Sequence, residues 1–114
     1  MKTMLVVNLH ETEFLDETLT LLARAEVRDC VVHEVDGVPS YHAGETPQLT
    51  TLSAVAGLFR QQRNINNLIV AIADEARVEE ISGALKSLYA KDRYACSFWF
   101  LPVSGYWYHK SAKE

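Results

Sequence analysis

Arginine residues precede two apolar segments of the chain. Arg60 and Arg63 come before the apolar residues 67–73, and Arg93, with Lys91, comes before the last apolar segment. A guanidinium group presents a planar fork that binds phosphate or carboxylate oxygens in a bidentate manner. If a nucleotide or carboxylate binds in a cleft below the long loop at residues 36–52, these side chains are the available cations. The alternative is that each is a solvated surface charge.

The histidines lack the spacing of a metal site. No His-x-x-x-His pair occurs among His10, His33, His42 and His109. Cys30 and His33 are three residues apart, which on a strand directs them to opposite faces and prevents joint chelation. Only convergence in space could make these residues metal ligands. We expect His42 to be the contact or sensor residue, because it lies in the loop and imidazole titrates near neutral pH.

The usual short motifs of catalysis are absent from the sequence. There is no Gly-x-Ser-x-Gly, no cysteine beside an evident base, and no glycine-rich anion loop carrying an arginine. Glu79 and Glu80 are adjacent on an expected helix and are typical of a solvated face. A small ferredoxin-like enzyme with a pocket between sheet and helices needs no such motif, so this alternative stays open.

Two halves of the sequence repeat the same order of apolar patterns. Residues 4–9 and 67–73 are short apolar runs typical of buried strands, and an amphipathic helix pattern follows each. A second strand pattern then follows at residues 30–35 and 94–103. Two strand-helix-strand units predict an α+β ferredoxin-like split βαβ fold (βαββαβ), with a four-stranded antiparallel sheet and two helices on one face. The first and third strands should be central.

A long irregular segment separates the two halves. Residues 36–52 contain Gly37, Gly44, Pro39 and Pro47, and show neither helical nor strand periodicity. Loops of this length are uncommon in compact domains and are usually functional, so we expect a flexible loop that includes a site. Asn8 interrupts the end of the first apolar strand. Its side chain either caps backbone groups or contacts a ligand.

Composition and charge narrow the class of protein. A chain of 114 residues fits a single domain, 1–114, and its net charge of -4 without a basic run argues against non-specific binding to nucleic acid or anionic membranes. No signal peptide or membrane-spanning segment is recognisable, so we expect a cytoplasmic protein without membrane insertion. Cys30 and Cys96 lie in apolar runs and are expected to be small buried hydrophobes on opposite sheet edges.

The expected sheet leaves one apolar face without helices. The first and third strands carry apolar residues at both odd and even positions, which point to opposite faces, so we expect both faces of the sheet to be shielded from water. Homo-oligomers commonly cover such a face and the bare edges beside it. We therefore predict a homo-oligomer with the aromatic residues 94–108 at the subunit contact. The alternative is that these aromatics close the core of a monomer.

The order of elements, the loop after the second strand, and the strings at residues 67–75 and 98–103 resemble the PII-like signalling family. The resemblance implies a trimer whose sheets line the interior and whose long loop, the T-loop, engages targets. It also implies adenine nucleotides bound in clefts between subunits. PII-type regulators carry a glycine-bearing phosphate loop before the last strand, and here Lys91, Asp92 and Arg93 stand in its place without a glycine.

Together these features predict a PII-like regulatory protein that binds a small effector, such as an adenine nucleotide, in intersubunit clefts. No cofactor is required. The expected homotrimer signals to a protein partner through residues 36–52. The candidate ligand-binding residues are Asn8, Gly37, His42, Arg60, Arg63 and Arg93. A small ferredoxin-like enzyme and a metal-responsive protein of similar fold are the alternatives.

Overall fold

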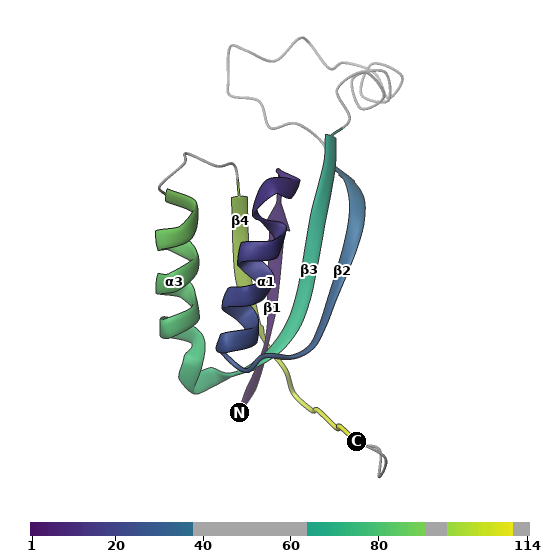
Figure 1. Cartoon of the computed structure of the whole chain (residues 1–114). Helices are drawn as coiled ribbons and strands as arrows, with labels where there is room; N and C mark the ends of the chain where they lie inside the picture. Colours follow the sequence, from purple (N-terminus) through teal and green to yellow (C-terminus); the bar gives the residue numbers. More distant parts are fainter. Residues whose placement is uncertain (38–63, 91–95, 111–114) are drawn as a thin grey trace, which may run out of the picture.

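The computed structural model describes residues 1–37, 64–90 and 96–110 (Figure 1). The elements, in chain order, are β1 (Lys2–Leu9), the 3₁₀ turn η1 (Thr12–Phe14), α1 (Leu15–Arg24), β2 (Arg28–Gly37), β3 (Asn64–Asp74), the 3₁₀ turn η2 (Glu75–Arg77), α3 (Val78–Ala90) and β4 (Cys96–Pro102). The order of strands and helices is the one that the sequence predicts.

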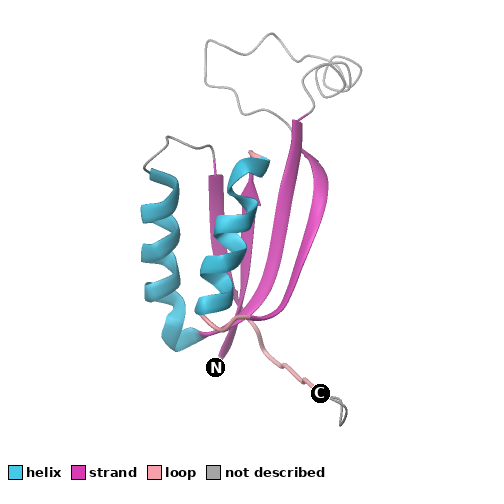
Figure 2. Cartoon of the chain, viewed as in Figure 1, coloured by secondary structure: helices cyan, strands magenta, loops and turns pink. Residues whose placement is uncertain are grey.

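The four strands form one sheet in the order β2-β3-β1-β4, and every neighbouring pair is antiparallel. Both helices cover the same face of this sheet (Figure 2). The predicted ferredoxin-like fold is therefore confirmed, with β1 and β3 central and β2 and β4 at the edges. The face without helices is called the open face below.

The core lies between the sheet and the helices. Leu5, Val7 and Ile69 from the sheet are fully buried against Leu22 of α1 and Leu85 of α3. Their alternation along each strand follows the two-residue period of a strand, so the intervening residues point to the open face. The helix stripes predicted from the sequence supply this core.

A buried hydrogen bond joins the two helices inside the core. The Thr18 and Tyr89 hydroxyl oxygens are 2.6 Å apart, so the two polar groups satisfy each other away from water. Tyr89 also packs edge-on against Phe14, with ring centroids 6.4 Å apart. Leu88, the residue before Tyr89, is half-buried and packs against the margin of the core.

Several element boundaries differ from the sequence prediction. β2 continues through Asp36 and Gly37, so these two residues are strand and not loop. A β-bulge lies between Arg28 and Val31, where Asp29 and Cys30 of β2 lie opposite the single residue Ala71 of β3. Asp29 within the bulge has a φ of 50°. β4 ends at Pro102, because proline has no backbone N–H to donate and is tolerated only at the end of a strand or on an edge strand.

The cysteines also differ in part from expectation. They lie on the opposite edge strands β2 and β4, as predicted, and both thiols are free. Cys30 is exposed, however, and Cys96 is half-buried. The prediction of burial was wrong for Cys30 because an apolar run in an edge strand lacks a covering element on one side.

Candidate functional site

The antiparallel register sorts the open face into an apolar end and a polar end. One row across all four strands consists of Val31, Val70, Val6 and Trp99. Two residues further along, the corresponding row consists of His33, Leu68, Asn8 and Ser97. The polar end is the end of the sheet at which β2 finishes, at Gly37, and β3 begins, at Asn64.

Three residues at this polar end form an amide cluster, which consists of Asn8, Gly37 and Asn66. The side-chain amide of Asn66 donates a hydrogen bond from Nδ2 to Oδ1 of Asn8 over 3.0 Å. A Cβ at Gly37 would lie only 2.5 Å from Asn66 Nδ2 and 2.7 Å from its Oδ1. The absence of a side chain at residue 37 therefore creates the space that Asn66 occupies.

The amide cluster holds an unpaired acceptor. Asn66 is only 2% exposed, and its Oδ1 has no hydrogen-bond partner. A buried polar atom without a hydrogen-bond partner lowers the stability of the fold by about 1–3 kcal/mol. Such atoms are therefore usually paired, either within the protein or with a bound molecule. Asn8 accepts at Oδ1 and keeps its own NH₂ group as a donor. The cluster therefore holds one unpaired acceptor that is buried in the single chain, and one amide donor.

Asn67 is the matching residue on the other side of the strand. It is also 2% exposed, and its Nδ2 lacks a partner. Successive side chains of a strand alternate between faces, so Asn67 lies on the helix face, opposite Leu9 of β1. The side chain of Asn66 therefore lies on the open face of the sheet, whereas that of Asn67 lies on the helix face.

The structure brings together two of the six candidate residues from the sequence. Asn8 and Gly37 meet through Asn66, which sequence reasoning did not select although the asparagine pair before the central strand was visible. The other four candidates, His42, Arg60, Arg63 and Arg93, lie outside the described residues. Residues 38–52 of the expected signalling loop lie outside them as well.

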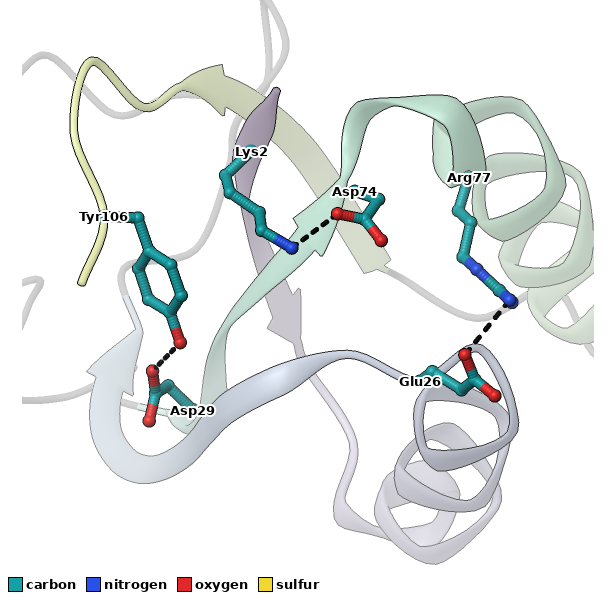
Figure 3. A network of polar contacts seen from close by, with 6 residues as sticks. All are labelled: Lys2, Glu26, Asp29, Asp74, Arg77 and Tyr106. Carbon is teal, nitrogen blue, oxygen red and sulfur yellow. Dashed lines mark hydrogen bonds and ion pairs between the residues drawn. The ribbon is translucent and has the colours of Figure 1, made fainter. Parts of the chain in front are cut away.

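The opposite end of the sheet is joined by ion pairs and hydrogen bonds (Figure 3). Lys2 Nζ lies 2.5 Å from Asp74 Oδ1, and Arg77 lies 3.2 Å from Glu26. The hydroxyl of Tyr106 donates a hydrogen bond to Asp29, which raises the pKa of Tyr106. This last contact ties the C-terminal segment, which leaves β4 at one edge, to the start of β2 at the other edge.

The aromatic residues near the C-terminus divide into two groups. Phe98 and Phe100 pack on the core, with ring centroids 6.2 Å apart. Trp99 is 43% exposed and Trp107 is 82% exposed, and the indole of Trp107 stacks on His109. The first group closes the core of the single chain, as the second sequence interpretation expects, and the second group leaves apolar surface exposed to solvent.

The buried thiol and phenol of the core are poorly suited to nucleophilic chemistry at neutral pH. Burial raises the pKa of the Cys96 thiol to about 11 and that of the Tyr89 phenol to about 12. A thiol attacks as its thiolate, which is scarce when the pKa lies far above the ambient pH. Both groups therefore act as neutral core residues.

The part of the chain that the structure describes contains neither a cluster of metal-binding side chains nor a membrane-spanning helix. Within residues 1–37, 64–90 and 96–110, no group of three or more His, Cys, Asp or Glu residues could hold a metal ion. No helix in these ranges is long and apolar enough to cross a membrane. Neither a metal centre nor a spanning helix is thus part of the described fold.

Of the comparisons with known proteins, the one with solved structures identifies the fold. The sequence matches no model of a known protein family, and it matches no curated protein. Among solved structures, a DUF3240 family protein from Shewanella baltica superposes with a TM-score of 0.64 at 11% identity, over 95% of this chain and 97% of that chain. A proposed PII-like signalling protein from Thermus thermophilus superposes with a TM-score of 0.56 at 14% identity, over 88% and 85% of the two chains.

The fold and the comparisons together define the class of protein. The chain is an α+β protein with a ferredoxin-like sheet and two helices on one face. More narrowly, it has the fold of PII-like signalling proteins, as the sequence resemblance predicted.

Proposed function

We propose that this chain is a PII-like regulatory protein that binds a small effector and signals its presence to a protein partner. In this proposal the chain forms a homotrimer, the effector binds in clefts between subunits, and residues 36–52 contact the partner. Ordering or displacement of a segment by a ligand is a common form of switch. The likeness in fold to a PII-like signalling protein supports the proposal.

The unpaired Oδ1 of Asn66 is the observation that carries this proposal. It is a buried acceptor beside Gly37, which is the last described residue at the start of the proposed signalling segment. An adenine base offers an amino donor next to a ring-nitrogen acceptor, and asparagine amides pair with this edge. An adenine nucleotide is therefore our first choice of effector, although the segment before β4 carries no glycine.

Calorimetric titration with ATP, ADP, AMP and cyclic dinucleotides tests the proposal. We expect at least one of them to bind the native protein, and we expect Asn66→Ser to weaken that binding by about tenfold or more, the effect of losing one good polar contact. Asn67→Ser is the matched control, because Asn67 is equally buried and lies on the opposite face.

The control separates loss of a ligand contact from loss of stability. Both variants remove a buried amide from the same strand, so both should lower the thermal midpoint to a similar extent. If Asn67→Ser weakens nucleotide binding as much as Asn66→Ser does, the open face is not the site. If no nucleotide binds the native protein, the proposed effector class is wrong.

A further inference from the structure

A groove lies between α1 and α3, in the helical layer on the other side of the sheet from the amide cluster. Its volume is about 540 Å³. The floor of this helix groove consists of five apolar side chains, two from α1 and three from α3: Leu21, Ala25, Ile81, Ala84 and Leu88. Figures 1 and 2 show the two helices side by side above the sheet.

Small side chains keep the helix groove open. Ala25 and Ala84 contribute only a methyl group each, so the two helices do not fill the space between them. Ile81 and Ala25 are buried at the bottom of the groove, whereas Leu21, Ala84 and Leu88 are half-buried. The groove thus presents partly exposed apolar surface that the single chain leaves uncovered.

The rim of the helix groove is predominantly acidic. Three carboxylates, Asp16, Glu17 and Glu80, line it together with a single guanidinium, Arg24. Arg77 lies 3.7 Å from Glu80 and offsets part of its charge. The acidic surplus is therefore concentrated at the start of α1, on Asp16 and Glu17.

We infer that the helix groove is a docking site for an amphipathic helix of a partner protein, one whose apolar stripe is flanked by lysine or arginine residues. The ten residues of α1 span about 15 Å, which matches roughly ten residues of a bound helix. Apolar residues at helical spacing would fill the floor, and the flanking cations would face the acidic rim.

The shape and charge of the groove disfavour other occupants. Sites for small molecules enclose most of the ligand surface, whereas this groove is open along the two helices. A second copy of the chain docked symmetrically would bring two acidic rims together, which like-charge repulsion opposes. The docking site is separate from the proposed effector site, since the sheet lies between them.

A fluorescent model peptide tests the inference with the full chain. The probe is a helix of about 14 residues, with leucine at positions i, i+3, i+4 and i+7 and lysine elsewhere, and its counterpart replaces lysine with glutamate. We expect the lysine peptide to bind and the glutamate peptide not to bind. Binding should weaken as salt is raised, and amide NMR shifts should appear at Leu21, Ala84 and Leu88.

Matched variants locate the contact. Ala84→Trp should fill the groove and weaken peptide binding at least tenfold, whereas Lys86→Trp, at an exposed position on the far side of the same helix, should leave it unchanged. Glu17→Gln should weaken binding more than Glu79→Gln, because only Glu17 lines the groove. Should Ala84→Trp not fold, Thr20→Arg adds a repulsive cation at the rim and should have the same effect on binding.

Three outcomes would overturn the inference. One is equal binding of the lysine and glutamate peptides. Another is NMR shifts confined to the open face of the sheet. The third is a change of oligomeric mass in Ala84→Trp or Thr20→Arg, which would assign the groove to contacts between copies of the chain.

Discussion

Gly37 and Asn66 approach each other so closely that position 37 has no room for a side chain. The Asn66 amide cannot simply move aside, because its Nδ2 is held by the Oδ1 of Asn8. A methyl group at position 37 would have to displace this amide, since it would lie 2.5 Å from Nδ2. The glycine is thus required by a neighbouring side chain and not by a turn.

Replacing this glycine should therefore be costly. We expect Gly37→Ala to lower the free energy of unfolding by about 1–3 kcal/mol, because the displaced amide loses its hydrogen bond while it stays buried. Urea unfolding followed by circular dichroism measures the change. Gly105→Ala is the control, since a Cβ there meets nothing within 4 Å, and it should change stability by less than about 0.5 kcal/mol.

At the scale of elements, three contacts hold the start of β1 in place: two join it to the end of β3, and one joins it to the residue after β4. Lys2 and Asp74 are directly opposite each other in the register of β1 and β3, and their side chains form an ion pair. The amide of Glu75 donates to the carbonyl of Met1, and the amide of Val103 donates to the carbonyl of Lys2. Asp74 is the residue before the η2 turn, but its carboxylate binds Lys2 and makes no side-chain cap.

The ion pair should make part of the stability depend on pH. Its hydrogen bond and the charge of Lys2 lower the pKa of Asp74 below the ordinary 3.8. A carboxyl with a lowered folded-state pKa stabilises the fold above its unfolded pKa, and this stabilisation is lost as the pH falls through the folded value. Asp74→Asn should therefore be less stable than the native chain at neutral pH.

The difference between Asp74→Asn and the native chain should close as the pH falls from 3.8 through the lowered pKa. Urea unfolding at a series of pH values from neutral to acid measures it. In a Lys2→Met background the same substitution should show little pH dependence. A constant difference across this range would mean that Asp74 acts through packing and not through its charge.

The sequence allows the strands and helices to be predicted because their apolar periods are local. The run at residues 67–73 identifies a central strand, and the stripe through Ile81 and Leu85 identifies the buried side of α3. The pairing of Asn66 with Asn8 could not be predicted, since it depends on the register of strands 58 residues apart. The bulge at Asp29 has no local signal either, because it arises where β2 is fitted to β3.

At the scale of the whole molecule, the open face of the sheet exposes apolar side chains that no helix of the same chain covers in the described residues. Its apolar end exposes Val31, Trp99 and Leu101, each more than 40% accessible. Contiguous exposed apolar surface is typical of a site at which one protein contacts another. The proposed trimer would cover it with the sheets of neighbouring subunits.

A charge on this face should dissociate the proposed trimer. We expect the native chain to elute with three times the mass of one subunit in size-exclusion chromatography with light scattering. Trp99→Lys should give a folded monomer, because a buried ammonium in the contact would lack a partner. Ser87→Lys, which adds the same charge on an exposed position of α3, should leave the trimer intact. A native monomer would contradict the proposed assembly.

The strand register places the chain termini and the amide cluster at opposite ends of the sheet. Lys2 pairs with Asp74 at one end of the sheet, whereas Gly37 pairs with Asn64 at the other. The N-terminus and the described C-terminal residues both lie at the first of these ends (Figure 1). A reporter domain, affinity handle or surface linker fused at this end would thus extend away from the amide cluster, and immobilised protein would keep that end of the sheet facing solution.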